Sequence, residues 1–596
     1  MSKLIVPAIR LQVSPVATIT IPARPKPLAK PISVSLTSLP PLIPYPELGS
    51  LVDASGKPIK LDTSQILALK LAIQGVDFSI IGKAGTGKST LMQAISLLWL
   101  SRHTWDWIEY RIKGEGRYEL APSIAIVAYT NKAADNIRNK LMSHPTIAEK
   151  FGYNVTTVHT LLEYVVEYTI NDEGVTKRRD YPKKDKDNKL AITHLVLEEA
   201  SMLGVGPVSL WQQLFDALPD GVQILLLGDI NQLPPVIGKS ILAYALQQIP
   251  VAELTKVHRT ALDNPIIRQA LSCLEGKKIQ QDYHGGQGVR VFHGKQKIKV
   301  ATANFEVSFS RLVAKMIAAG EFDPYEDMIL SPFFKDNDNA VSAKNLAKAV
   351  ATIISQKEHR EVYEIIVGFI TMYLAVGDRV FMDKIEGIVT KIEINSMYTG
   401  KLPRTASRNM DYSGRIIGNR GAIETEAAGE DFMEYDYSAV DIDAMLSSDN
   451  EDEKKRSASH IVYIRPKRFL QGEDRADHIC SSVGDFASLT LGYALSVHKA
   501  QGSEWPNVIV ALHDSNAILL FRELIYTAMT RARNRLDIMA QEHVLDKAVA
   551  TQRIKGNTLA AKIEYFNGGY LDQIVDISKP AKVDTALTGE RDNNNE

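Results

Sequence analysis

The sequence has too few cysteines for a disulfide framework and no apolar run long enough to span a membrane. Its two cysteines, Cys273 and Cys480, lie far apart in 596 residues and have no metal-ligand spacing. Pro7 and Arg10 interrupt the apolar stretch at the N-terminus, so we do not expect a signal peptide. A transmembrane helix needs about 20 consecutive apolar residues, and the sequence has no such run. We therefore predict a cytoplasmic protein without a membrane partner.

An excess of positive charge is also missing. The net charge is -1, which by itself argues against a simple polyanion-binding protein. However, residues 421–453 contain twelve Asp and Glu and no Lys or Arg, and without them the chain has 69 basic and 58 acidic residues. Such an acidic run is most often a disordered loop, with protein docking or DNA mimicry as minority alternatives. The rest of the chain is modestly basic, which permits nucleic-acid binding.

The composition and the order of apolar stretches indicate a folded α/β protein. A content of 45% hydrophobic and 23% charged residues is typical of globular proteins, and the length allows about four domains. Residues 1–50 hold ten of the 26 prolines and are expected to form an extended arm. After Leu61, apolar strand-like stretches alternate with helix-like stretches, as in FSIIG, SIAIVAY, THLVLEE and VQILLLGD. This alternation favours a parallel sheet covered by helices on both faces.

A phosphate-binding loop follows the first of these strands. The stretch GKAGTGKS fits the pattern G-x-x-x-x-G-K-[ST] and lies between an expected strand and an expected helix. Its glycines let backbone amides surround a polyphosphate, Lys88 reaches the β and γ phosphates, and the Ser89 hydroxyl coordinates Mg²⁺. The predicted nucleotide-binding residues of this loop are Gly82, Gly85, Thr86, Gly87, Lys88, Ser89 and Thr90.

Two adjacent carboxylates follow the apolar run in THLVLEEASM. A buried strand that ends in Glu198 and Glu199 is an unfavourable place for negative charge unless a cation is bound there. Taken alone, the pair would more often be a solvated strand end. Together with the phosphate loop, it predicts Glu198 as the magnesium-side carboxylate and Glu199 as the general base that activates water.

Further motifs occur in a fixed order along the chain. They are TSQILAL, VAYTNKAADNI, TTVHTLL, GDINQLPPV, LTKVHRT, YALSVHKAQGSEW and LIYTAMTRAR, between about Leu61 and Ile538. With the phosphate loop and the glutamate pair, this set resembles a superfamily 1 helicase of the branch that includes the RecD and Dda-type DNA helicases. Relatives of this kind also occur in phages, so the resemblance hints at a viral source.

The resemblance implies roles for single residues. Gln65 would read the adenine, Gln232 would link the γ phosphate to the DNA-binding surface, and Gly502 and Glu504 would lie near the nucleotide or the DNA. Two arginines, Arg259 and Arg531, would neutralise the transferring phosphoryl group when the domains close. The catalytic set is thus Lys88, Glu199, Gln232, Arg259 and Arg531. The expected contacts with single-stranded DNA come from Thr130, Asn131, Thr157, His159, Ser496 and His498.

Two departures from the family pattern and several alternatives remain open. Glu198 stands where the family has aspartate, and Thr260 stands where it often has glutamine after the arginine. His159 and His498 could equally be packed or capping histidines, and Arg533 and Arg535 are expected to be structural or solvated. The basic residues of the polar insertion, Lys177, Arg178, Arg179, Lys183 and Lys184, could contact a DNA fork or form a solvated turn.

The resemblance also implies the fold and the domain organisation. We expect two RecA-like parallel-sheet domains with small inserted β modules. The first occupies residues 51–253 and carries a hairpin at about 163–190. The second comprises 254–380 and 484–550, is interrupted by a small β-barrel-like module at 381–483, and is followed by a C-terminal segment at 551–596 with a disordered tail.

The predicted function is that of an ATP-dependent DNA helicase that uses ATP and Mg²⁺, moves on single-stranded DNA and unwinds forked DNA. It would serve replication, recombination or repair, act as a monomer and meet replication proteins. The alternatives are an RNA or ribonucleoprotein remodelling ATPase, because these motifs do not reveal recognition of the 2′-hydroxyl, or a DNA-stimulated ATPase subunit of a larger complex. A 5′ to 3′ direction of movement is expected from the resemblance alone.

Overall fold

The fold was analysed in a computed structural model of the 596-residue chain. The structure describes residues 60–100, 123–142, 155–170, 176–205, 209–235, 239–294, 302–334, 340–368, 370–382, 385–398, 403–417, 457–467 and 477–567. The predicted N-terminal arm, the acidic segment and the C-terminal tail lie outside these ranges. No helix within them is both long and apolar enough to cross a membrane. Cys273 and Cys480 are buried, and neither forms a disulfide within the described ranges.

The first domain contains a six-stranded sheet in which all neighbouring strands are parallel. The strand order is β10-β1-β8-β6-β2-β3. The strands are β1 (Phe78–Gly82), β2 (Ile124–Ala128), β3 (Val155–Thr157), β6 (His194–Leu197), β8 (Gln223–Gly228) and β10 (Val251–Leu254). Because β1, β8 and β6 are adjacent, the phosphate loop, the loop after Gly228 and the glutamate pair all begin at the same edge of the sheet.

Helices cover both faces of this sheet, as the sequence predicted. Alternate residues of a strand point to opposite faces. Ile80 accordingly packs with α1 and α2, whereas Ile81 packs with α7 and α8. The helices are α1 (Thr63–Gln74), α2 (Lys88–Leu100), α4 (Asn131–Met142), α6 (Val158–Leu161), α7 (Leu210–Asp216) and α8 (Ile241–Gln248), with a 3₁₀ turn, η4, at Ala200–Met202. Asp62 caps α1 in a capping box with Gln65.

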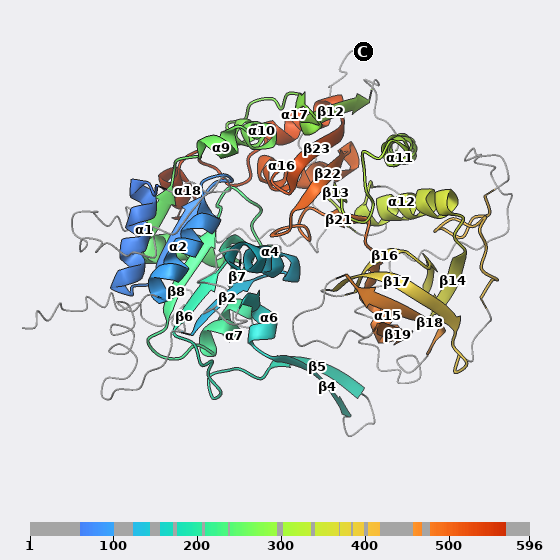
Figure 1. Ribbon diagram of the computed structural model, residues 1–596, viewed down its shortest axis with the longest axis horizontal. Coiled ribbons are helices and arrows are strands. Elements are labelled where there is room, and N and C mark those ends of the chain that lie inside the picture. Colours follow the sequence, from blue (N-terminus) through green and yellow to red (C-terminus); the bar gives the residue numbers. More distant parts are fainter. Residues whose placement is uncertain are drawn as a thin grey trace, which may run out of the picture.

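The second domain contains another six-stranded sheet, in the order β11-β12-β23-β22-β13-β21. Only the β11–β12 pair is antiparallel. The strands are β11 (Asp282–His284), β12 (Gln287–Gly294), β13 (Met328–Ser331), β21 (Ala494–Ser496), β22 (Trp505–Leu512) and β23 (Ala532–Gln541). The helices are α9 (Arg259–Leu262), α10 (Pro265–Leu274), α11 (Thr302–Ala318), α12 (Ala343–Glu358), η6 (Asp514–Leu519), α16 (Arg522–Met529) and α17 (Glu542–Ala550). The predicted α/β class with two RecA-like sheets is confirmed (Figure 1).

Two short antiparallel strand pairs lie outside the six-stranded sheet of the first domain. β4 (Tyr164–Ile170) and β5 (Thr176–Pro182) form the predicted antiparallel hairpin, which projects from the first domain (Figure 1). β7 (Gly204–Val205) and β9 (Lys239–Ser240) form a short pair beside η4.

The module inserted in the second domain is an antiparallel sheet in the order β19-β18-β17-β16-β20. It consists of β16 (Arg379–Met382), β17 (Ile385–Ile394), β18 (Ser457–Pro466), β19 (His478–Ser482) and β20 (Leu489–Leu491), with α15 (Val483–Ala487) and the hairpin β14 (Val362–Val367) and β15 (Ile370–Ala375). Its core includes residues of β14 and of β20 and so extends beyond the expected bounds of 381–483. In the described ranges β19 and β20 are the two ends of the sheet, which is open rather than a closed barrel.

The first part of the C-terminal segment at 551–596 packs on the first domain. Its helix α18 (Leu559–Asn567) packs on α8 of the first domain. In Figure 1 this dark red helix lies with the first domain, although α17 lies with the second. The chain therefore crosses back between the domains after residue 550.

A buried carboxylate stabilises the junction between the module and the second domain. Asp378 is fully buried and accepts hydrogen bonds from the Tyr412 hydroxyl (2.8 and 2.9 Å), the Tyr493 hydroxyl (3.1 Å) and the Ala375 amide (2.8 Å). Arg360 Nη1 lies 3.4 Å from its Oδ1. Burial raises the pKa of Asp378 from 3.8 to about 6, although these donors oppose the rise.

The pH dependence of stability should reveal this group. The raised pKa means that the contribution of Asp378 to stability is fully present below pH 3.8 and is lost as the pH rises through about 6. We expect the melting temperature of Asp378→Asn, relative to wild type, to rise between about pH 4.5 and pH 7. Thermal unfolding followed by circular dichroism measures this difference. The exposed Asp187→Asn should show no such trend, and a parallel response of the two variants would contradict the assignment.

Candidate functional site

The phosphate loop has the geometry that its sequence predicts. Gly85 and Gly87 have φ angles of 79° and 84°, which L residues with a side chain rarely adopt. The Lys88 ammonium lies across the loop and donates to the carbonyls of Gly82 (2.6 Å) and Lys83 (3.2 Å). The Thr86 hydroxyl also donates to Lys83 O, at 2.9 Å. Lys88 therefore lies close to the backbone of the loop, at the start of α2.

The glutamate pair lies at the end of β6, where one carboxylate is buried and the other is partly exposed. Burial raises the pKa of Glu198; the Glu199 charge raises it further, and Lys88 opposes both. Glu199 has a left-handed backbone with φ 52°, an uncommon conformation for a residue with a side chain that is often found at functional sites. The pair thus lies near Lys88.

Gln232 connects the two domains. With its amide oriented to satisfy both neighbours, Gln232 donates to Glu199 Oε2 (3.3 Å) and accepts from Arg531 Nη2 (3.2 Å). Arg531 is buried and is held by the carbonyls of Thr527 (3.0 Å) and Ser503 (3.3 Å). Three predicted catalytic residues, taken from separate parts of the sequence, therefore form one chain of hydrogen bonds.

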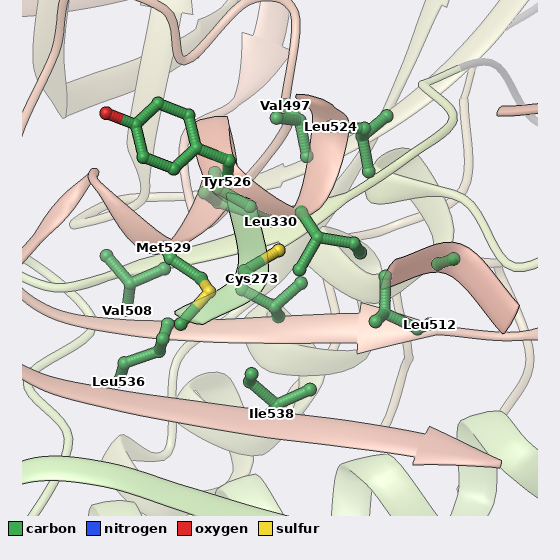
Figure 2. Packing of buried hydrophobic residues seen from close by; sticks show 14 of the residues in the cluster. Cys273, Leu330, Val497, Val508, Leu512, Leu524, Tyr526, Met529, Leu536 and Ile538 are labelled. Carbon is green, nitrogen blue, oxygen red and sulfur yellow. The ribbon is translucent and has the colours of Figure 1, made fainter. Parts of the chain in front are cut away.

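Tyr526 is a site residue that the sequence did not single out. Its ring packs in the apolar core of the second domain, and Figure 2 shows its hydroxyl pointing away from the other labelled side chains. This hydroxyl donates to Asp229 Oδ2 (2.6 Å) and accepts from the amide of Ala84 in the phosphate loop (2.8 Å). Tyr526 lies five residues before Arg531 within the motif LIYTAMTRAR.

The segment around Arg259 lies against the phosphate loop. The His258 amide donates to Gly85 O at 3.1 Å, and a Cβ built at Gly85 would lie 2.7 Å from Ala261. The backbone thus brings Arg259, the first residue of α9, beside the loop. Gln65, the predicted adenine reader, is buried beside Gly87, and its Nε2 lies 3.3 Å from His258 Nε2. His258 is a second neighbour of the loop that the sequence did not single out.

Gly502 and Glu504 lie where the second domain meets α4. A Cβ at Gly502 would be 2.8 Å from Ala133 and 3.9 Å from Glu199 Cγ. Glu504 pairs with Arg533 at 3.1 Å; although burial opposes it, Lys140, Arg531 and Arg533 lower the pKa of Glu504. Arg533, which was expected to be structural or solvated, is exposed and forms this ion pair. Both predicted residues therefore lie near the glutamates, at the domain interface.

The expected DNA-contact hydroxyls all have local hydrogen-bond partners. Thr130 Oγ1 accepts from the Ala133 amide at the start of α4, and Thr157 Oγ1 accepts from the Thr160 amide at the start of α6. Ser496 Oγ accepts from the Lys499 amide. Thr157 and Ser496 are buried, so their contacts with DNA stay predictions that the geometry does not favour for their side chains. Thr130 and Asn131 are partly exposed.

The two expected DNA-binding histidines differ in environment. The His159 ring packs edge-on against Tyr164, with ring centroids 5.0 Å apart, near the base of the β4–β5 hairpin. Burial, and then Arg553, lower the pKa of His498 to about 4. His498 is therefore neutral at pH 7 and offers no charge to a phosphate.

The oxygen ligands at the glutamate pair fit magnesium. Mg²⁺ prefers hydroxyl and carboxylate oxygens and usually keeps several waters. Lys140 Nζ lies 3.4 Å from Ser89 Oγ, and Lys88 and Lys140 oppose the rise in the pKa of Glu198 that burial causes. Ser89 and Glu198 would hold the ion, which would shield the charge on the phosphates.

Comparisons with known proteins agree with this arrangement. A model of an AAA domain matches residues 65–238, and a model of the UvrD-like helicase C-terminal domain matches residues 491–539. The chain is 25% identical over 481 residues to the ATP-dependent RecD2 DNA helicase of Deinococcus radiodurans, which covers 80% of this chain and 49% of that protein. It is 22% identical over 510 residues to the RecBCD enzyme subunit RecD of Buchnera aphidicola, covering 82% and 74%.

The chain is similar in sequence to RecD-like helicases. This confirms the resemblance predicted from the motifs, while a phage origin stays a prediction. The chain spans about half the length of the RecD2 relative. A crystal structure of the Pif1 helicase from Candida albicans also matches, with 16% identity, a TM-score of 0.38 and coverage of 86% of this chain and 99% of that one. The α/β fold of the chain is shown by the strand orders of its two six-stranded sheets.

Proposed function

We propose that this chain is an ATP-dependent DNA helicase of superfamily 1 that moves on single-stranded DNA and unwinds forked duplex. The observation that carries the proposal is the hydrogen-bond chain Glu199–Gln232–Arg531, which joins the first domain to the second. It connects a candidate general base of the first domain to a candidate phosphate-binding arginine of the second. The RecD2 and Pif1 names of its relatives support the same reading.

Hydrolysis would follow from closure of the two domains. Lys88 and the loop amides bind the phosphates, and Glu199 accepts a proton from the attacking water. Arg531, and Arg259 beside the loop, neutralise the charge that spreads over the transferring phosphoryl group. Magnesium supplies further charge neutralisation when it is bound by Ser89 and Glu198. Because Arg531 belongs to the second domain, loss of the γ phosphate removes one reason for closure and allows the domains to separate.

The DNA path follows from the positions of the loops. Thr130, Asn131 and His159 follow β2 and β3 at the carboxyl edge of the first sheet, at or near the starts of α4 and α6. Hydroxyl, amide and imidazole groups can bind a sugar-phosphate backbone without selecting a base. We propose that the β4–β5 hairpin separates the strands at the fork. Monomeric action, a cytoplasmic location and contacts with replication proteins stay predictions.

Single-turnover unwinding of a labelled duplex tests this proposal. We expect ATP-dependent separation of a duplex with a 5′ single-stranded tail and not of one with a 3′ tail, and no separation by Lys88→Ala. Equal opening of both substrates would contradict the direction. DNA-stimulated hydrolysis without any separation would favour the alternative of a subunit that needs partners, and stimulation by RNA but not by DNA would favour RNA remodelling.

A further inference from the structure

The C-terminal segment from Thr551 to Asn567, here called the strap, joins the second domain to α8 of the first domain. It leaves α17 of the second domain, where Arg522 N donates to Thr551 O at 2.7 Å. It ends with α18 on the first domain (Figure 1). Its apolar side chains are buried in the core of the first domain; they are Ile554, Leu559, Ile563 and Phe566. The strap is thus an integral part of the first domain's packing.

The strap buries a lysine against the loop that carries Gln232. Lys562 is 2% exposed, and its ammonium donates to Ile230 O at 3.2 Å. Burial lowers the pKa of Lys562, while the charges of Glu523 and Asp229 oppose this change. Burying an ammonium is costly, and an apolar side chain in the same place would often be equally or more stable. Packing alone therefore does not explain a lysine here.

The loop held by Lys562, residues 229–233, is short, and hydrogen bonds hold both of its ends. Asp229 Oδ1 accepts from the amide and the side chain of Asn231, and its Oδ2 accepts from Tyr526. The Leu233 amide donates to Thr527 Oγ1 at 3.0 Å. Gln232, between these anchored positions, projects to Glu199 and Arg531. A shift of the Ile230 carbonyl would therefore move Gln232 along with its neighbours.

The strap is also anchored to the helix that precedes Arg531. The Glu523 carboxylate, at the start of α16, accepts from the amides of Arg553 (3.1 Å) and Ile554 (2.8 Å). The same helix carries Tyr526 and Thr527, which contact the loop from the other side. One segment thus connects to the loop that carries Gln232 and to the helix that precedes Arg531.

We propose that Lys562 is a positioning residue which, through the Ile230 carbonyl, holds the loop of residues 229–233 so that Gln232 bridges Glu199 and Arg531. This inference rests on the proposed function, because the bridge matters for hydrolysis. Lys562 touches neither the phosphate loop nor Glu199. Removal of the Lys562 side chain should therefore reduce the stabilisation of the transition state and leave the affinity for ATP unchanged.

The test compares Lys562→Met with Lys555→Met in the full chain. Lys555 is an exposed lysine of the same strap, so the two variants lose the same charge. We expect Lys562→Met to lower kcat of DNA-stimulated hydrolysis about tenfold and to change KM for ATP less than about twofold. Lys555→Met should match wild type in both. If Lys562→Met melts more than about 5 °C below wild type, Lys562→Gln, which keeps an N–H donor, replaces it and should show a smaller loss of kcat.

A double-mutant cycle separates positioning from a general loss of structure. If Lys562 acts through Gln232, Lys562→Met should cause no further loss of kcat in a Gln232→Ala background. Additive losses would overturn the inference, as would a kcat equal to that of Lys555→Met. In both cases wild-type hydrolysis would still respond to DNA, and the proposed function would stand. A wild-type protein without DNA-stimulated hydrolysis would instead overturn the function and the inference together.

Discussion

Glu199→Gln is expected to lower kcat of DNA-stimulated ATP hydrolysis about a thousandfold. The amide has the size of the carboxylate but cannot accept a proton from water, so the general base is lost while the site keeps its shape. Glu199 is partly exposed and contacts Gln232 at 3.3 Å, and an amide can maintain that hydrogen bond after reorientation. ATP binding should therefore change little. Phosphate release measures the rate, and titration with a fluorescent ATP analogue measures binding.

The matched control for this prediction is Glu253→Gln. Glu253 lies on β10, where it pairs in register with Ile81 of the phosphate-loop strand, and its side chain is exposed. The Glu253→Gln variant should hydrolyse ATP at nearly the wild-type rate. If Glu199→Gln retained a rate within about tenfold of wild type, the general base would have to be another group, and Glu198 would be the first candidate.

The second large effect is expected for Arg531→Ala, which should lower kcat about a thousandfold. A guanidinium from a second domain stabilises the charge of the transferring phosphoryl group only when the domains close, so its removal acts on the transition state. Arg531→Lys should recover only part of the rate. A lysine keeps the charge but cannot reproduce the contacts with Thr527 O, Ser503 O and Gln232 together.

Arg533→Ala provides the comparison for Arg531. Arg533 is two residues away but is exposed and pairs with Glu504, so we expect its loss to change kcat less than about tenfold. Melting temperatures should accompany both measurements, because Arg531 is buried and its removal also leaves carbonyl groups without donors. Equal effects of the two substitutions would contradict the assignment of Arg531 to the phosphates.

The candidate site could be predicted from the sequence wherever one short segment contains the whole requirement. The phosphate loop needs glycines at left-handed positions and a lysine at the start of a helix, and both requirements lie within eight consecutive residues. The glutamate pair likewise follows its strand directly. The expected roles of Thr157 and Ser496 were less reliable because a hydroxyl at the end of a strand can either cap the next turn or face a ligand. The pattern is the same in both cases.

The sequence alone determined the α/β class, the phosphate loop, the glutamate pair and the β4–β5 hairpin, because each depends on contacts between near neighbours in the chain. The tertiary structure alone decided which distant groups meet. Tyr526 reaches Asp229 across 297 positions, and Lys562 reaches Ile230 across 332. Neither pair has a local pattern, since a tyrosine in an apolar helix and a lysine in an amphipathic one are ordinary until packing removes water around them. Burial then makes a hydrogen bond necessary for each polar group, and the fold determines its partner.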